Sequence, residues 1–145
     1  EYLNNPQATA DSFTDDGWFK TGDRVTLERD GYITFADRDK DMLKVGGENV
    51  AAAEIEAMLQ THPAVKLAQV VGVPDPRYVE VPAAFVELAE GAEASEAELI
   101  AHCKGKLASF KVPRHVRTVT EWPMSTSKIQ KFRLRDSLIA ELQGV

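Results

Sequence analysis

The sequence predicts an α+β domain with a central sheet of roughly three strands, flanking helices and a short β-hairpin. Runs rich in β-branched and aromatic residues alternate with stretches whose apolar residues recur every three or four positions. Proline, glycine or a capping residue bounds most of these stretches. The 145 residues, 43% of them hydrophobic and 28% charged, are enough to bury one core.

The beginning of the chain predicts little beyond one hairpin. Residues 1–23 are polar and rich in turn-forming residues, so we expect no independent fold there. The runs 24–28 and 32–36 are β-branched and aromatic, and Asp30-Gly31 between them indicates a β-hairpin. Because a lone two-stranded hairpin is marginal in water, this one is expected to pack poorly by itself.

A charged stretch with a Gly-Gly pair follows at residues 38–50, which read RDKDMLKVGGENV. Residues 42–45 and 48–50 are expected to pair across Gly46 and Gly47, because glycine permits a sharp turn and a close approach of backbone to a ligand. This stretch predicts a joint in the chain with a tight hairpin beside it.

The next elements are a helix and two strands. The apolar spacing predicts a helix over 51–61, with Asn49 as its N-cap and Pro63 ending it. Residues 65–73 and 82–88 have the composition of strands, and a turn-rich segment with prolines and charged residues separates them.

A capping-box pattern opens a second helix at Ser95, with Glu98 three residues later. Leu99, Cys103 and Leu107 then fall on one face of that helix. The sequence therefore places Cys103 in the core and does not favour it as a nucleophile.

The carboxyl-terminal part predicts one strand, an exposed loop and one helix. Residues 115–120 have strand composition, and residues 123–127 are expected to form the loop. A terminal helix is predicted over 128–142, with Leu134, Leu138 and Leu142 on one side.

The charges are distributed unevenly along the chain. The net charge is −6, yet residues 104–135 hold nine of the 17 Lys and Arg against a single acid, Glu121. A basic segment on an otherwise acidic protein suits a phosphorylated ligand better than a polyanion, so nucleic acid is not expected as a partner.

Several kinds of site and location are not favoured. No run of 18 apolar residues predicts a membrane span, and no charged-then-apolar leader is visible, so a cytoplasmic protein is expected. The single cysteine agrees with a reducing compartment. His62, His102 and His115 lack the spacing of a metal site, and no metal ligands are predicted.

Three stretches, in this order and with these gaps, carry a resemblance to a known family. They are residues 17–23 (GWFKTGD), residues 38–50 quoted above and residues 123–131 (PMSTSKIQK). The chain resembles the adenylate-forming superfamily, which contains acyl- and aryl-CoA ligases, peptide-synthetase adenylation domains and luciferases. The resemblance implies that residues 1–39 are the tail of the N-terminal AMP-binding domain and residues 40–145 the mobile C-terminal lid domain.

By the same resemblance, Lys128 is the catalytic lysine of adenylation. A carboxylate that attacks the α-phosphate of ATP brings two anions together, and an ammonium group between them offsets the repulsion in the transition state. The family usually has glycine directly before this lysine, whereas this chain has Ser127. A left-handed backbone at that position would cost serine about 1–2 kcal/mol.

The resemblance also implies the other site residues. Asp23 is expected to accept hydrogen bonds from the ribose hydroxyls, and Arg38 to contact the nucleotide. Lys40 is the expected hinge between the two half-reactions. In the second half-reaction Gly46 and Gly47 are expected to line the tunnel for the pantetheine arm of CoA, and Lys44 is expected to face the active site.

The implied function is that of the C-terminal part of an ATP-dependent acyl- or aryl-CoA ligase. The parent would convert a small carboxylic acid and ATP to acyl-AMP and pyrophosphate, and then CoA to the thioester and AMP. ATP, CoA and Mg²⁺ belong to the parent, the partner is the N-terminal domain of the same polypeptide, and the fragment alone is expected to be inactive. The alternatives are a peptide-synthetase adenylation domain, a luciferase-like enzyme, or a non-catalytic anion-binding or interaction module.

Overall fold

The computed structural model describes residues 1–144, apart from the side chain of Ala36, and the chain divides into two compact units, Glu1–Lys40 and Asp41–Val145. Val145, the last residue of the predicted lid domain, lies outside the described residues. The assignment of residues 1–39 to a larger AMP-binding domain stays a prediction.

The first unit contains one short helix and one hairpin. Helix α1 (Pro6–Asp11) begins after Asn5, whose side chain accepts a hydrogen bond from the backbone N–H of Ala8. Strands β1 (Asp23–Leu27) and β2 (Ile33–Arg38) pair antiparallel, which confirms the hairpin predicted from the Asp-Gly turn. Every residue of β1 is exposed, as expected for a hairpin without a core of its own.

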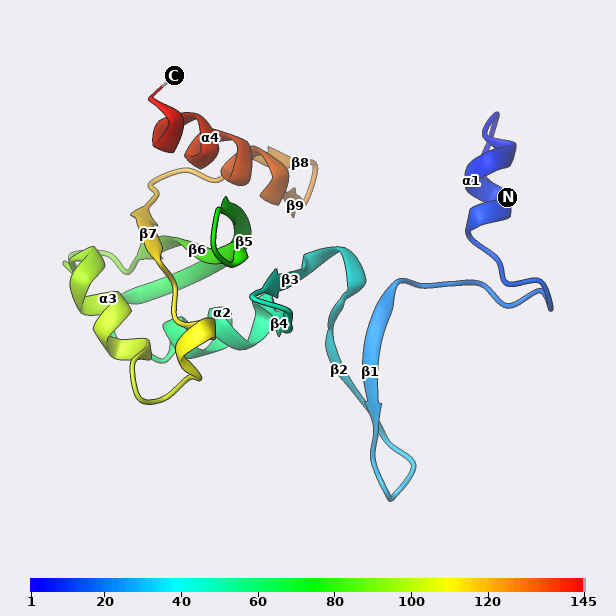
Figure 1. The fold of residues 1–145 in the computed structure, drawn as a ribbon, viewed down its shortest axis with the longest axis horizontal. Helices are drawn as coiled ribbons and strands as arrows, with labels where there is room; N and C mark the ends of the chain where they lie inside the picture. The colour runs from blue at the N-terminus through cyan, green and yellow to red at the C-terminus, as the bar shows by residue number, and fades with distance from the viewer. Residues whose placement is uncertain (145) are drawn as a thin grey trace. The chain divides into compact units, whose positions relative to one another are not determined.

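A five-stranded sheet forms the centre of the second unit (Figure 1). Its path runs β4-β3-β6-β5, and β7 pairs parallel with β6. The α+β class is confirmed, and the sheet is wider than three strands because the glycine hairpin joins it through the pair Val45 and Val79. The strands are β3 (Met42–Val45), β4 (Glu48–Ala51), β5 (Val65–Asp75), β6 (Val79–Leu88) and β7 (His115–Thr118).

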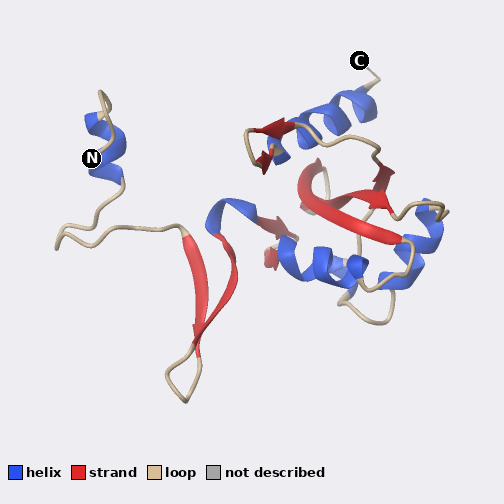
Figure 2. Cartoon of the chain, turned by 180° about the vertical axis from the view of Figure 1, so that it is seen from behind, coloured by secondary structure: helices blue, strands red, loops and turns tan. Residues whose placement is uncertain are grey.

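Helices cover both faces of this sheet. Helices α2 (Ala52–Gln60) and α3 (Glu96–Cys103) lie on one face, and α4 (Lys131–Gln143) lies on the other, as Figures 1 and 2 show. Successive side chains of a strand point to opposite faces. Thus Ala84 and Val86 of β6 pack with α2 and α3, whereas Ala83 and Phe85 pack with α4.

Two helix starts test the capping predictions. Ser95 caps α3 as expected, since its side chain accepts a hydrogen bond from the N–H of Glu98 at 3.2 Å. Asn49 does not cap α2, so that prediction was wrong. Asn49 lies in β4 opposite Lys44. Helix α2 begins at Ala52, and its N-cap residue, Ala51, provides no side-chain hydrogen bond.

The carboxyl-terminal prediction also needs correction. Residues 123–127 are not a loop leading into a helix, because β8 (Met124–Ser125) and β9 (Lys128–Ile129) form a tight hairpin. Helix α4 therefore starts at Lys131 instead of residue 128. Its buried face carries Leu134 and Leu138, while Leu142 is 47% exposed.

Candidate functional site

Asp23 and Arg38 are brought together by the register of the first hairpin. They are the terminal pair of β1 and β2, and Arg38 Nε lies 3.1 Å from Asp23 Oδ1. Their side chains remain 31% and 44% exposed, respectively. The pair therefore presents both an acceptor and a fork of donors to a polar ligand.

Lys40 lies in a 3-10 turn, Asp39–Asp41, where one compact unit ends and the next begins. Such a position between compact units is where backbone rotation disturbs the fewest packed side chains. Its role as a hinge stays a prediction.

The glycine turn between β3 and β4 is fixed by Tyr78. Gly46 has φ +60° and donates its N–H to the carbonyl of Tyr78 at 2.7 Å. A Cβ on Gly46 would lie 3.2 Å from Tyr78 Cδ1, whereas a Cβ on Gly47, at φ +91°, would meet nothing within 4 Å. Both positions favour glycine by conformation, and a side chain at Gly46 would also crowd the ring of Tyr78.

The backbone next to this turn is held by Glu80. Lys44 has an exposed side chain and donates its N–H to Glu80 Oε2 at 3.0 Å. The other oxygen of Glu80 lies 3.8 Å from Arg135 on α4. Glu80 therefore joins the backbone of β3 to α4.

Asp75 organises the turn that carries Tyr78. Its carboxylate accepts the N–H groups of Arg77 and Tyr78 at 2.8 and 2.9 Å. These two backbone donors, with that of Tyr78 first, hold the pKa of Asp75 below its ordinary value. Val79 follows with φ +70°, an unusual conformation for a β-branched residue that marks a constrained turn.

A pocket lies beside the glycine hairpin, and it was missed by the sequence analysis. The guanidinium carbon of Arg114 lies 5.1 Å from the centre of the Tyr78 ring, within the range of a cation–π contact. An aromatic face next to a cation suits a nucleotide. The lining residues are Val45, Tyr78, Val81, Pro82, Ser109, Phe110 and Arg114.

Lys128 lies on β9 of the second hairpin and is exposed. Within residues 1–144 its side chain makes no hydrogen bond or ion pair, so its ammonium group is available to a ligand. Its strand neighbour across the hairpin is Ser125.

The left-handed backbone conformation considered for Ser127 occurs at Thr126 instead. Thr126 and Ser127 form the two-residue turn, and Thr126 has φ +50° whereas Ser127 is not among the residues with positive φ. A positive φ at only the first turn residue is typical of a type II′ turn, which prefers glycine there. Replacement of the usual glycine by Ser127 therefore strains nothing at that position.

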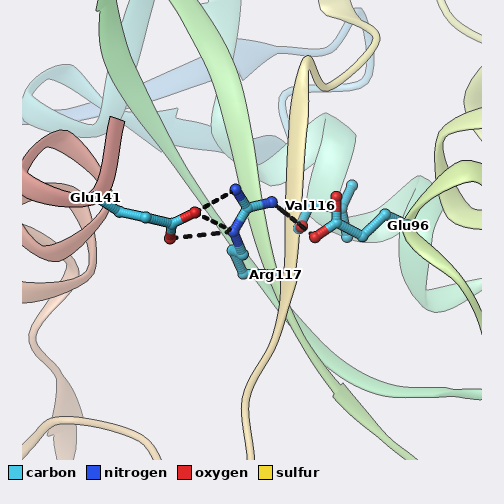
Figure 3. A network of polar contacts seen from close by, with 4 residues as sticks. All are labelled: Glu96, Val116, Arg117 and Glu141. Carbon is cyan, nitrogen blue, oxygen red and sulfur yellow. Dashed lines mark hydrogen bonds and ion pairs between the residues drawn. The ribbon is translucent and has the colours of Figure 1, made fainter. Parts of the chain in front are cut away.

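Arg117 connects the strand β7, on which it lies, to the helices α3 and α4 (Figure 3). It donates to Glu141 on α4 at 2.6 Å and to Glu96 on α3 at 2.7 Å, from its own position on β7. The hydrogen bonds to Glu141 are the main reason why the pKa of Arg117 is raised, and they lower the pKa of Glu141. The network fixes the orientation of α4.

The histidines and the cysteine belong to the packed part of the fold. His62 and His102 lie edge to face with their centroids 5.0 Å apart, and burial is the main cause that lowers the pKa of His102. Burial raises the pKa of Cys103, which confirms it as a core residue. In the part of the chain that the structure describes, no cluster of three or more His, Cys, Asp or Glu is placed to hold a metal.

Across residues 1–144, no helix has both the length and the apolar character needed to cross a membrane. Apart from Lys40 in its 3-10 turn, the predicted site residues occupy three hairpins. Asp23 and Arg38 share the first hairpin, Lys44 and the two glycines share the second, and Lys128 lies on the third.

Comparison with known proteins identifies the family. A family described as AMP-binding enzyme C-terminal domain matches residues 54–128. The chain is 44% identical over 138 residues to the protein named medium-chain acyl-CoA ligase ACSF2, mitochondrial, of Macaca fascicularis. It is 46% identical over 139 residues to the putative acyl-CoA synthetase YngI of Bacillus subtilis.

These matches cover most of this chain but little of the relatives. The match with the macaque protein covers 94% of this chain and 22% of the relative, and that with YngI covers 95% and 25%. Among solved structures, ATP-bound MatB from Rhodopseudomonas palustris has a TM-score of 0.87 at 36% identity, over 95% of this chain and 28% of that one. The chain therefore spans about a quarter of the length of these relatives.

Proposed function

The chain belongs to the family of AMP-binding enzyme C-terminal domains, and we propose that it is the carboxyl-terminal part of an ATP-dependent acyl- or aryl-CoA ligase. The parent enzyme joins a carboxylic acid to ATP, releases pyrophosphate, and transfers the acyl group from AMP to CoA. The observation that carries this proposal is the ammonium group of Lys128, which has no partner within residues 1–144 and lies on a hairpin in a chain of this family.

Lys128 acts in the first half-reaction. The attack of a carboxylate on the α-phosphate develops negative charge on oxygens that repel one another. A lysine whose side chain is exposed and unpaired within residues 1–144 can enter that site without first breaking an ion pair. Its positive charge then stabilises the transition state more than the separated substrates, which is the condition for acceleration.

Asp23 and Arg38 contribute to nucleotide binding. Their ion pair keeps both side chains in place while leaving them partly exposed, and a carboxylate with two acceptor oxygens suits a pair of ribose hydroxyls. Mg²⁺ would be held chiefly by the phosphates of ATP, as is usual for this ion, and we expect no ligand to it from this chain.

The glycine hairpin and the pocket beside it serve the second half-reaction. Gly46 and Gly47 offer backbone without side chains, which suits a narrow passage for the pantetheine arm of CoA. Tyr78, Phe110 and Arg114 offer aromatic and cationic groups suited to the nucleotide end of the same molecule. Rotation at Lys40 would exchange this surface for that of Lys128.

The acid, the partner and the location follow from the parent. The relatives' names point to a fatty or small organic acid as the class of substrate, and the partner is the N-terminal domain of the same polypeptide. A cytoplasmic location stays a prediction, since one of the relatives has the word mitochondrial in its name.

The experiment measures each half-reaction in the full-length enzyme with Lys128→Ala. Pyrophosphate release from acid and ATP should fall by at least about a hundredfold, because a charge-stabilising group in the transition state is lost. Thioester formation from supplied acyl-AMP and CoA should stay within about twofold of the unmodified enzyme. Undiminished pyrophosphate release would contradict the proposal.

A further inference from the structure

We propose that Glu56 and Lys131 are positioning residues for the adenylation step: their ion pair fixes the base of the hairpin that carries Lys128. This inference rests on the function proposed above for Lys128. Neither residue is among those expected to bind the nucleotide, the acid or CoA, and neither is proposed to touch a substrate.

Glu56 is a partly buried carboxylate with two partners on one oxygen. Its side chain is 14% exposed, and Oε1 accepts the N–H of Val70 and the Nζ of Lys131, each at 2.8 Å. Helix α2, strand β5 and the first residue of α4 therefore meet at one atom. A carboxylate with both a backbone donor and a cation on it is held more firmly than one in a surface pair.

The contact with Val70 fixes where this carboxylate lies. Strand β5 is at the end of the sheet path, so one of its edges has no neighbouring strand. The N–H of Val70 donates to Glu56, which satisfies a backbone group that an open edge would leave without a strand partner. The carboxylate that binds Lys131 is thus also bonded to the backbone of the sheet.

Lys131 is three residues from Lys128, and the chain between them has little slack. Ile129 packs against the apolar cluster beneath α4, and the N–H of Gln130 donates to the carbonyl of Pro123 at 2.7 Å. This hydrogen bond closes the hairpin at its base. Three residues of extended chain span about 10 Å at most, so a fixed Lys131 limits where Lys128 can lie.

The side chains of the hairpin tip are not held in the same way. Thr126, Ser127 and Lys128 are exposed, and the side chain of Lys128 has no hydrogen-bond or ion-pair partner within residues 1–144. The base of the hairpin is therefore held by hydrogen bonding and packing, whereas the ammonium group of Lys128 has no partner within residues 1–144. A hairpin fixed at its base holds the ammonium group of Lys128 near one position relative to the domain, as catalysis by positioning requires.

The chain contains a matched control for this ion pair. Lys111 binds Glu54 on the same helix, at 2.7 Å, and its side chain is 23% exposed, the same fraction as that of Lys131. The Lys111 pair joins α2 to the 3-10 turn Ser109–Lys111, and within residues 1–144 it makes no hydrogen bond or ion pair with the hairpin. Glu54 is more exposed than Glu56, at 44% against 14%, so the two pairs match in the lysine and its helix but not in the carboxylate. Loss of either lysine removes one ion pair of α2, but only Lys131 is proposed to support Lys128.

The test compares Lys131→Met, Lys131→Arg and Lys111→Met in the full-length enzyme, with each half-reaction measured separately. Lys131→Met should lower kcat for pyrophosphate release by about ten- to a hundredfold, the effect of an ångström-scale misplacement. KM for ATP and the thioester half-reaction should change by less than about twofold. Lys131→Arg, which retains the ion pair, should restore most of the rate, and Lys111→Met should leave adenylation unchanged.

Three outcomes would overturn the inference. Adenylation could proceed normally in Lys131→Met although Lys128→Ala abolishes it, in which case the ion pair is irrelevant and the proposed function stands. Alternatively, Lys131→Met and Lys111→Met could lower both half-reactions and the thermal midpoint equally, which would reveal a role in stability alone. If Lys128→Ala itself leaves adenylation intact, the proposed function and this inference fail together.

Discussion

Asp23 and Arg38 face each other at the open end of the first hairpin, with Arg38 Nε 3.1 Å from Asp23 Oδ1. Two residues 15 positions apart, each expected separately to contact the nucleotide, thus form an ion pair, and we propose that they act together on the nucleotide. The guanidinium orients the carboxylate, and the carboxylate keeps one acceptor oxygen free of this ion pair.

We predict that Asp23→Asn in the full-length enzyme raises KM for ATP by roughly tenfold or more. The amide accepts with one oxygen only and loses the charge that pairs with Arg38, and hydrogen bonds to charged groups contribute about 1.5–3 kcal/mol. Asp30→Asn is the control, because Asp30 lies in the exposed turn of the same hairpin. Equal KM values for the two variants would remove Asp23 from the nucleotide site.

The pocket predicts a separate effect on CoA. Arg114→Ala should raise KM for CoA by about tenfold in the thioester half-reaction, because a cation beside the Tyr78 ring is lost. Arg77→Ala is a close control: its guanidinium carbon lies 5.2 Å from the same ring, but Arg77 does not line the pocket. A rise of the same size in both variants would argue for a general charge effect instead of a site.

The turn of the Lys128 hairpin predicts opposite effects for neighbouring glycine substitutions. Thr126→Gly should increase the free energy of unfolding by about 1 kcal/mol, because it removes a β-branched residue from a positive φ. Ser127→Gly should decrease it by roughly 0.5–1 kcal/mol, since Ser127 is not among the positive-φ residues and glycine only adds freedom to the unfolded chain. Urea unfolding of the 145-residue chain measures both, and a stabilising Ser127→Gly would contradict this turn geometry.

The Arg117 network predicts a pH dependence of stability. The pKa of Glu141 is lowered from 4.5 in the folded state, chiefly by hydrogen bonds from Arg117. The unfolded chain therefore binds more protons than the folded chain as the pH falls below about 4.5, and the stabilisation present above that pH is lost. Arg117→Met should be less stable than the unmodified chain at pH 7, and the difference should shrink in acid.

Urea unfolding at several pH values between about 3 and 7 measures this difference. Glu87 also has a lowered pKa, because of hydrogen bonds from Lys66 and Trp122, but it is present in both proteins and its effect cancels in the comparison. A difference between the two proteins that is constant over this range would show that the Glu141 carboxylate is not linked to Arg117.

Much of the fold could be predicted because its signals are local. Asp30-Gly31 specified the first hairpin, Ser95 specified the start of α3, and the runs that became β5 and β6 had strand composition throughout. Asn49 misled the prediction, because a good capping residue was placed in β4 by its pairing with Lys44. Local propensity was overridden there by the ladder of the sheet.

The tight hairpin around Lys128 could not be foreseen in the same way. Its turn residues, Thr126 and Ser127, carry none of the glycine or asparagine that usually marks such a turn. The pocket was also hidden, since Tyr78 and Arg114 are 36 positions apart and meet only because β6 pairs with β7. The ion pair of Glu56 and Lys131 spans 75 positions, and no periodicity reports such a contact.

The turn at 75–80 has a broader consequence. Its Tyr78 carbonyl binds Gly46, its Glu80 side chain binds the backbone of Lys44, and its Tyr78 ring forms a wall of the pocket. One short segment thus dictates the shape of both surfaces proposed to receive the thiol substrate. A substitution in this segment that altered the preference for the thiol acceptor would therefore change the glycine hairpin and the pocket together. Exchanging the segment between relatives should transfer the properties of both surfaces at once.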